Sequence, residues 1–266
     1  MKKRVISAIV MALITIPILI IGGKLSAIFF TALCLISLYE LFKMRESKKK
    51  FPFLMKLFAY LLATFFCLSN FDSTVLVVNL DYRILTAIIF VFLIPIVFIN
   101  DNDKYNIQDA LFLVGSFLFL GLSFNLLITI RNFDLNYVLY ILAITVFTDI
   151  FAFIVGKYIG SHKLAPKISP NKTIEGLIGG LAMGTFVATV FYCTVIGGSL
   201  NIFFIILITL ALSFVGQIGD LVFSSIKRYY GKKDFSNFLP GHGGILDRCD
   251  SLIFVSLAFI LVMAVL

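Results

Sequence analysis

Charged residues are scarce in this chain. Asp, Glu, Lys and Arg make up 14% of its 266 residues, whereas 61% of the residues are hydrophobic and the mean hydropathy is +1.07. A soluble domain is about one quarter charged. The composition therefore leaves little room for a separate soluble domain and predicts a protein that crosses a membrane several times.

Cysteine is also sparse. The four cysteines, Cys34, Cys67, Cys193 and Cys249, show no paired spacing, and three of them fall within apolar segments. A disulfide framework and a zinc site both depend on patterned cysteine spacing, so the sequence argues against both. The phosphate-binding motif G-x-x-x-x-G-K-S/T is absent around the basic loops.

Long apolar segments are plentiful, and several exceed the ~18 residues that cross a bilayer as a helix. We expect an all-α fold with about nine spans, and we interpret the first as a retained helix because no small-residue cleavage site follows it. The first five spans form a predicted N-terminal transmembrane region, 1–130, and the others form a C-terminal region, 131–266. The expected spans are 5–22, 25–43, 52–70, 83–99, 108–130, 136–156, 176–198, 202–226 and 251–266.

Basic residues gather in the segments 2–4, 43–50, 156–176 and 227–248. With nine spans and a cytoplasmic N-terminus, all of these segments face the cytoplasm, as the positive-inside rule requires. The C-terminal region then carries two cytoplasmic loops, 157–175 and 227–248. The net charge of +8 is explained first by this orientation and second by an anionic lipid or nucleotide ligand.

Two carboxylates, Asp149 and Asp220, lie within apolar spans. An ionised group at membrane depth is costly and usually marks a function. Counting at 1.5 Å per residue, both lie roughly 10–12 Å below the cytoplasmic surface, so both are able to face one cavity. A protonated carboxylate or a structural ion pair is the alternative for each.

The eighth span carries a polar stripe. Ser213, Gln217, Asp220, Ser224 and Lys227 follow one another at intervals of three or four residues and share one helix face. A hydrogen-bonded seam between helices would explain the serines and Gln217. It would not explain why the stripe runs into a charged loop.

Asp247 and Asp250 lie three residues apart at the start of the ninth span. Acidic residues are favourable at a helix N-terminus in any case. Together with Asp220 they form a set of hard oxygen donors that suits Mg²⁺. We therefore expect a hydrophilic cavity in the cytoplasmic leaflet, lined by Asp220, Ser224, Lys227, Asp247 and Asp250.

Two loops look suited to phosphate. Gly243 and Gly244 allow backbone N–H groups to approach a ligand before a helix N-terminus, although a plain turn is the alternative, and His242 either joins the site or bonds within the loop. The loop 163–176 holds three lysines around two prolines, among them Lys167 and Lys172, with Ser169 and Thr173 nearby. The following glycines, Gly176, Gly180 and Gly184, predict close helix packing.

The sequence SSIKRYYGKKDFSNFLPGHGGILDRCDS, residues 224–251, resembles the signature of the phosphatidate cytidylyltransferases, the CDP-diacylglycerol synthases. The segments 163–180 and 215–221 also resemble that family, whereas the first four spans match it only in being hydrophobic. Phe223 departs from the pattern, since many members have a glutamate there. The matching residues are Ser225, Lys227, Arg228, Lys233, Asp234, Pro240, His242, Gly243, Gly244, Asp247, Arg248 and Asp250.

The resemblance implies transfer of a cytidylyl group from CTP to phosphatidic acid, giving CDP-diacylglycerol and pyrophosphate with Mg²⁺. It implies catalytic roles for Asp220, Lys227, Asp247 and Asp250, of which the three aspartates hold the metal. Lys167 and Lys172 are assigned to CTP phosphates, and Lys227 and Arg228 to phosphatidic acid or pyrophosphate. The expected substrate-binding residues are Lys167, Ser169, Lys172, Thr173, Ser213, Gln217, Ser224, Arg228, Lys233, His242, Gly243, Gly244 and Arg248.

The expected partners are CTP, phosphatidic acid and membrane lipid, without nucleic acid; a homodimer is left open. The expected location is a bacterial inner or plasma membrane, with several spans and the active site facing the cytoplasm. Two other classes of membrane protein are alternatives. The D-G…A-R…G…D…D arrangement of CDP-alcohol phosphatidyltransferases is absent. An ion-coupled transporter would explain the buried carboxylates but not the two basic loops.

Overall fold

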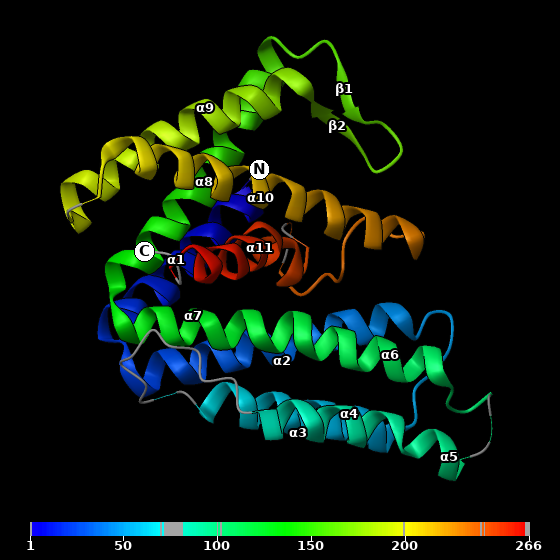
Figure 1. The fold of residues 1–266 in the computed structure, drawn as a ribbon. Coiled ribbons are helices and arrows are strands. Elements are labelled where there is room, and N and C mark those ends of the chain that lie inside the picture. Colours follow the sequence, from blue (N-terminus) through cyan, green and yellow to red (C-terminus); the bar gives the residue numbers. More distant parts are fainter. Residues whose placement is uncertain are drawn as a thin grey trace. The chain divides into compact units, whose positions relative to one another are not determined.

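The computed structural model describes residues 2–69, 71, 82–99, 101, 103–198, 200–239, 241 and 243–263. Over these residues the chain is mainly helical, with one two-stranded antiparallel sheet (Figure 1). It divides into two compact units. The first unit comprises Met1–Phe133 and Phe235–Leu246, and the second comprises Asp134–Asp234 and Asp247–Leu266.

The first unit is a helical bundle in which α2, α3 and α7 pack on one another and α4 packs on α6 (Figure 1). Buried aromatic side chains fill its centre, among them Phe42, Phe117 and Phe124. The helix α4 ends just before Pro95, which lacks an N–H donor and begins the next helix. The elements are α1 (Lys2–Ile21), α2 (Gly23–Arg45), α3 (Phe53–Ser69), α4 (Tyr82–Leu93), α5 (Pro95–Ile99), α6 (Ile107–Ser116), the π-helix η1 (Phe117–Gly121) and α7 (Leu122–Phe133).

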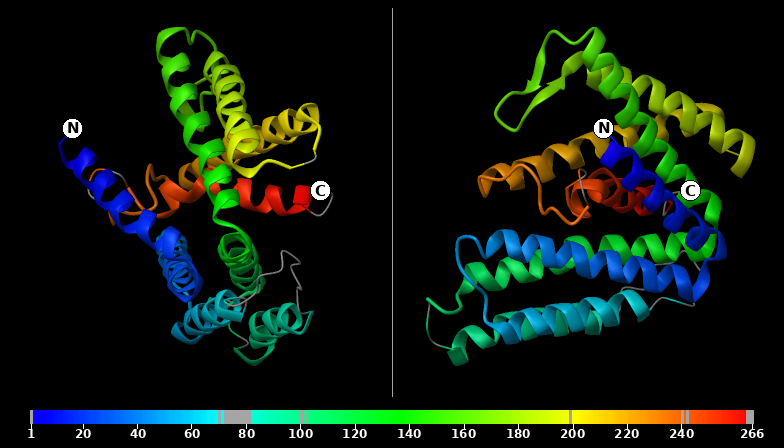
Figure 2. Two further views of the ribbon diagram at one scale, coloured as in Figure 1. Left: turned by 90° about the vertical axis from the view of Figure 1, so that its left-hand side faces the viewer. Right: turned by 180° about the vertical axis from the view of Figure 1, so that it is seen from behind.

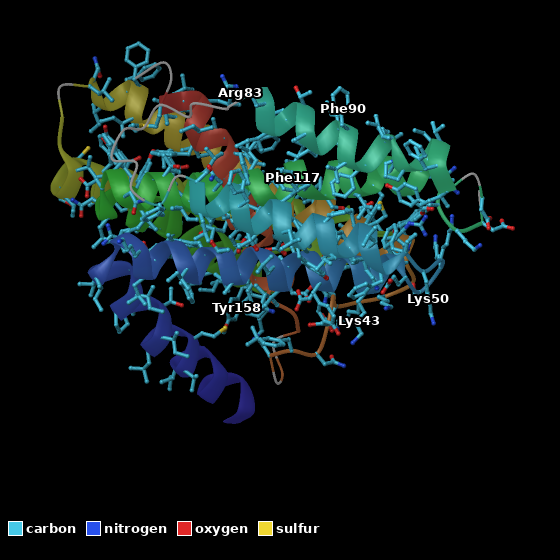
Figure 3. The ribbon with its side chains drawn as sticks, turned by 90° about the horizontal axis from the view of Figure 1, so that it is seen from below. Lys43, Lys50, Arg83, Phe90, Phe117 and Tyr158 are labelled. Carbon is cyan, nitrogen blue, oxygen red and sulfur yellow. The ribbon has the colours of Figure 1, made fainter. Side chains whose placement is uncertain are left out.

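An ion-pair cluster joins the end of α2 to the start of α6. Asn106 and Asp109 form a capping box, in which each side chain accepts a hydrogen bond from the other residue's backbone N–H. The buried Asp109 carboxylate also accepts from Arg45 at 2.9 Å and from Lys49 at 2.5 Å. Figure 3 shows Lys43 and Lys50 at this same end of α2. Cations are favourable here because the C-terminal end of the helix dipole is negative.

The second unit consists of four long helices and the hairpin. α8 and α9 lie side by side, and the hairpin extends from the end that they share (Figure 2). Asp134, Thr173 and Asn201 begin α8, α9 and α10 by accepting a hydrogen bond from a first-turn N–H group. The elements are α8 (Leu135–Tyr158), β1 (Lys163–Ala165), β2 (Ser169–Thr173), α9 (Ile174–Phe191), the π-helix η2 (Tyr192–Ile196), α10 (Ile202–Tyr229) and α11 (Leu246–Met263).

The glycine stripe of α9 faces α8. A Cβ atom on Gly176 would lie 2.7 Å from the backbone oxygen of Ala152, and one on Gly180 would lie 2.7 Å from that of Thr148. Neither distance is tolerated, so only glycine lets these helices approach so closely. The predicted role of the stripe in close packing is confirmed.

All nine predicted spans fall on helices in the described part of the chain, up to Met263 in the last. Among the described residues, five helical segments are both long and apolar enough to cross a membrane, namely Gly23–Arg45, Ile107–Phe133, Leu135–Tyr158, Ile174–Ile196 and Ile202–Tyr229; shorter apolar helices there cover Ile9–Ile21, Phe53–Ser69 and Arg83–Ile99. An all-α membrane protein is therefore confirmed at this level. The number of spans and the side of the N-terminus stay predictions.

The loops differ in detail from the predicted ones. The loop predicted at 157–175 contains the β1–β2 hairpin, with Lys163 paired to Thr173 and Ala165 to Ser169. The loop predicted at 227–248 is shorter, because α10 continues to Tyr229 and α11 begins at Leu246. Lys227 and Arg228 favour this extension, since cations stabilise the last turn of a helix.

Candidate active site

A cavity of about 590 Å³ lies within the second unit. Residues of α8, α9, α10, the hairpin and the first turns of α11 line it, together with Asp234. Its volume is in the range of sites for small ligands, ~300–1,000 Å³. The lining residues are Asp149, Ala152, Phe153, Gly156, Lys157, Leu164, Asn171, Lys172, Thr173, Gly176, Leu177, Gln217, Asp220, Lys227, Asp234, Asp247, Arg248 and Asp250.

One ion pair connects the hairpin to α10 at this cavity. Lys172 Nζ lies 2.7 Å from Asp220 Oδ2, and about a quarter of each side chain is exposed, 24% and 26%. Ser224, one turn further along α10, donates a hydrogen bond to Asp220 Oδ1 at 3.2 Å. A lysine of strand β2 thus forms an ion pair with an aspartate of α10.

A second ion pair connects α10 to α11. Lys227 Nζ donates to Asp247 Oδ1 at 2.7 Å, with only 11% and 3% of the two side chains exposed. Burying two charges is costly, and each charge needs the other. Asp250 lies one turn further along α11, so both acidic residues of this helix line the cavity.

The polar stripe of α10 serves two purposes along its length. At its N-terminal end, the hydroxyl oxygens of Ser213 and Thr148 lie 2.7 Å apart, and Gln217 Nε2 donates to the carbonyl oxygen of Leu177 at 3.1 Å. These bonds form the seam between α10 and its neighbours. Gln217 also lines the cavity, as do Asp220 and Lys227 toward the C-terminal end of the helix.

The cavity gathers many of the residues predicted from the sequence, and Asp149 lines it together with Asp220. Arg228 does not line it; its Nε donates to the carbonyl oxygen of Ile168 at 3.1 Å and its Nη1 to that of Lys232 at 3.2 Å. Other predicted residues outside the lining set are Lys167, Ser169, Ser213, Ser224 and Lys233; Gly243 and Gly244 belong to the first unit, and Pro240 and His242 lie outside the described residues.

Several lining residues were not singled out from the sequence. Asn171 and Lys172 are neighbours in the same motif, SPNKT, but only the charged member was chosen. Lys157 lies in the last turn of α8, which ends at Tyr158. Asp234 matches the family signature but was not among the predicted site residues. Phe223 is fully buried and packs edge-to-face on Phe254, so an apolar contact takes the place of the glutamate common at this position.

The carboxylates of the cavity suit a hard cation by their chemistry. Within the described residues, no group of three or more His, Cys, Asp or Glu side chains lies close enough to hold a metal ion. Mg²⁺, however, needs only one or two protein carboxylates when water and substrate phosphate complete its shell. Asp220 and Asp247 are carboxylates of this kind, and each lies 2.7 Å from a lysine ammonium group.

Residues 2–266 match the cytidylyltransferase family. The chain belongs to this family. It is also similar to proteins named phosphatidate cytidylyltransferase: it is 40% identical over 255 residues to the one from Staphylococcus haemolyticus, 39% over 256 residues to the one from Staphylococcus epidermidis and 38% over 258 residues to the one from Staphylococcus aureus. Each alignment covers 96% of this chain and 96% of the relative. The resemblance predicted from the motifs is therefore confirmed.

Proposed function

We propose that this chain transfers the cytidylyl group of CTP to phosphatidic acid, giving CDP-diacylglycerol and pyrophosphate for phospholipid biosynthesis. Relatives that align with nearly the whole chain are named phosphatidate cytidylyltransferase. The observation in this chain that carries the proposal is the cavity of the second unit. Lysines and aspartates from segments typical of the family converge there in an otherwise apolar protein.

The chemistry is nucleophilic substitution at phosphorus. A phosphate oxygen of phosphatidic acid attacks the α-phosphorus of CTP, and the bond from that phosphorus to the bridging oxygen of the β-phosphate breaks, releasing pyrophosphate. The attacking phosphomonoester is already mostly a dianion at neutral pH, since its second pKa is about 6, so no strong general base is needed. The barrier comes mainly from repulsion between anions and from charge on the leaving group.

The cationic side chains of the cavity are suited to reduce the repulsion between the anions and to stabilise the charge on the leaving group. We assign Lys172, together with Lys167 of the same hairpin, to the phosphates of CTP. Lys227 lies at the end of α10 and is assigned to the phosphate of the lipid or to pyrophosphate. Lys172 and Lys227 each lie 2.7 Å from an aspartate oxygen. A substrate phosphate offers each lysine an equivalent anionic partner, and this exchange would free the carboxylates.

Freed carboxylates are suitable ligands for Mg²⁺, and we assign Asp220, Asp247 and Asp250 to this role. When bound, the cation supplies electrostatic stabilisation of the charge that builds up on the leaving pyrophosphate. Asp149 adds a further carboxyl group to the cavity wall. Arg248, in the first turn of α11, adds a cation that is suited to bidentate phosphate binding.

The membrane arrangement that we propose has nine spans, a cytoplasmic N-terminus and an active site that faces the cytoplasm of a bacterial cell. Residues 1–130 form the N-terminal transmembrane region and 131–266 the catalytic region. The basic loops favour this orientation by the positive-inside rule. It also gives the site access to CTP from the cytoplasm and to phosphatidic acid from the bilayer.

Release of pyrophosphate by the purified full-length protein tests the function. In detergent–lipid micelles with CTP and Mg²⁺, we expect pyrophosphate to appear only when phosphatidic acid is present. Diacylglycerol, which lacks the phosphate nucleophile, is the matched control lipid and should give no release. Pyrophosphate release that is independent of phosphatidic acid would contradict the proposal.

A further inference from the structure

Glu40 is a buried carboxylate in the first unit that the sequence did not single out. It lies near the C-terminal end of α2, and only 1% of the residue is exposed. Its helix neighbour Leu41 is buried as well. A carboxylate in such surroundings is costly unless hydrogen bonds satisfy both of its oxygens.

Those bonds come from both ends of the segment that precedes α11. The Ser236 hydroxyl donates to Glu40 Oε1 at 2.6 Å. The backbone N–H groups of Ile245 and Leu246 donate to Oε1 and Oε2 respectively, each at 2.9 Å. One side chain therefore clips together the beginning and the end of a segment of about ten residues.

The segment between these contacts is shaped to fit the carboxylate. The N–H of Leu239 donates to the carbonyl oxygen of Gly243 at 2.8 Å, which closes a turn. At Gly244, an added Cβ atom would lie 2.5 Å from both carboxylate oxygens of Glu40. The requirement for glycine at position 244, the last of the GHGG motif, is thus explained without a phosphate: a side chain there would collide with Glu40.

The clip acts at the first turn of α11. This helix begins at Leu246, and its first N–H groups have no acceptor within the helix. Glu40 supplies acceptors, and its negative charge favours the positive end of the helix dipole. Asp247 is the next residue in the chain, and Asp250 follows one turn later. Because Asp247 lies in this first turn and Asp250 one turn later, fraying of the turn would loosen the backbone that carries both aspartates.

We propose that Glu40 is a positioning residue for the transferase reaction. It holds the first turn of α11 and thereby orders the backbone that carries Asp247 and Asp250, without touching a substrate itself. The inference rests on the proposed function, because it takes those aspartates as part of the active site. It explains why an apolar helix in the first half of the chain retains a buried carboxylate.

The substitution Glu40→Gln tests this role at nearly constant size. An amide keeps one acceptor oxygen but turns an NH2 group toward a backbone N–H donor. We expect kcat to fall about tenfold or more, which corresponds to about 1.4 kcal/mol in the barrier, while KM for CTP stays within about threefold. Glu46→Gln is the matched control: Glu46 caps the same helix and pairs with Lys56 at 2.7 Å, so its kcat should not change. An unchanged kcat in Glu40→Gln, or a change in KM alone, would overturn the proposal.

Gly244→Ala tests the clip from the opposite side and serves also if Glu40→Gln does not fold. In the wild-type background its methyl group collides with Glu40, so kcat should fall. In a Glu40→Ala background the methyl group has room, and the double variant should be no slower than Glu40→Ala alone. If the two losses multiplied as independent effects do, Gly244 would not act through Glu40.

Hydrogen exchange tests the clip independently of enzymatic activity. Peptides that cover residues 241–250 should exchange faster in Glu40→Gln than in the wild type, while peptides from α3 and α10 keep their protection. Unchanged exchange at 241–250 would overturn the clip even in an active enzyme. Faster exchange in a protein without transferase activity would uphold the clip and refute the proposed function, so the two failures are distinguishable.

Discussion

Lys172 and Lys227 each hold a cavity aspartate at 2.7 Å, but the two pairs differ in burial. The Lys172–Asp220 pair is about one quarter exposed, whereas the Lys227–Asp247 pair is almost closed off from solvent. Exposed pairs contribute little to stability, while removal of one member of a buried pair strands the other charge. In the proposed chemistry both aspartates are metal ligands, but only Asp247 is expected to contribute much to the stability of the fold.

Asp220→Asn and Asp247→Asn should each reduce turnover at saturating Mg²⁺ to below about a tenth of wild type, a barrier increase of more than ~1.4 kcal/mol. Asp247→Asn should in addition lower the midpoint of thermal unfolding, because it leaves the buried Lys227 ammonium without its carboxylate. Steady-state kinetics and thermal unfolding in detergent check the two effects.

The exposed Asp103, in the segment between α5 and α6, provides a control: Asp103→Asn should change neither quantity. If Asp220→Asn kept more than about a tenth of wild-type turnover, Asp220 would not be a metal ligand. Equal unfolding midpoints for the two active-site variants would contradict the difference in burial.

The two basic loops should divide the substrates between them. Lys172→Ala should raise KM for CTP about tenfold, because the ammonium group is a point charge for phosphate. Lys163→Ala is its matched control: Lys163 is exposed on the other strand of the hairpin and does not line the cavity. Kinetics with each substrate varied in turn would contradict this division if Lys172→Ala raised KM for phosphatidic acid alone.

Arg228→Lys should lower activity even though it keeps the charge. Arg228 donates from two nitrogens to the carbonyl oxygens of Ile168 and Lys232, and a single ammonium group does not reproduce this geometry. The bond to Ile168 holds the turn of the hairpin that carries Lys172. Kinetic constants of Arg228→Lys indistinguishable from those of the wild type would show that the guanidinium geometry is unimportant.

Among the elements, the contact between α8 and α9 depends most directly on single residues. A Cβ atom on Gly184 would collide with the Thr148 hydroxyl and lie 3.0 Å from its Cα. Gly184→Ala should therefore destabilise the protein by about 1–3 kcal/mol through overpacking. Gly115→Ala, in α6, is the control, since nothing lies within 4 Å of a Cβ atom there. Thermal unfolding that ranked Gly115→Ala below Gly184→Ala would contradict this packing.

The longer helices could be predicted from the sequence because they are apolar segments bounded by polar or glycine residues. The polar stripe of α10 was equally visible, since side chains three and four residues apart share a helix face. The β1–β2 hairpin was not predicted, because its strands are very short and polar and alternate too briefly to give a strand pattern. Glu40 was missed because its partners lie about two hundred residues away in the sequence and are mostly backbone N–H groups.

At the scale of the whole molecule, the proposed nine spans predict which loops face the cytoplasm. In a variant without native cysteines, single cysteines at the exposed positions Lys48, Asn237 and Asn201 would report the side of each loop. A membrane-impermeant maleimide should label Asn201→Cys in intact cells. It should label Lys48→Cys and Asn237→Cys only after permeabilisation. Labelling of Asn237→Cys in intact cells would contradict a cytoplasmic active site.

The fate of the individual phosphorus atoms of CTP tests cytidylyl transfer most directly. The purified wild-type protein should be incubated with phosphatidic acid, Mg²⁺ and CTP labelled either at the α- or at the γ-phosphate. Attack at the α-phosphorus predicts that the α-label enters the lipid extract while the γ-label leaves as pyrophosphate, in equal amounts. A γ-label in the lipid, or an α-label that remains in water-soluble nucleotide, would contradict cytidylyl transfer.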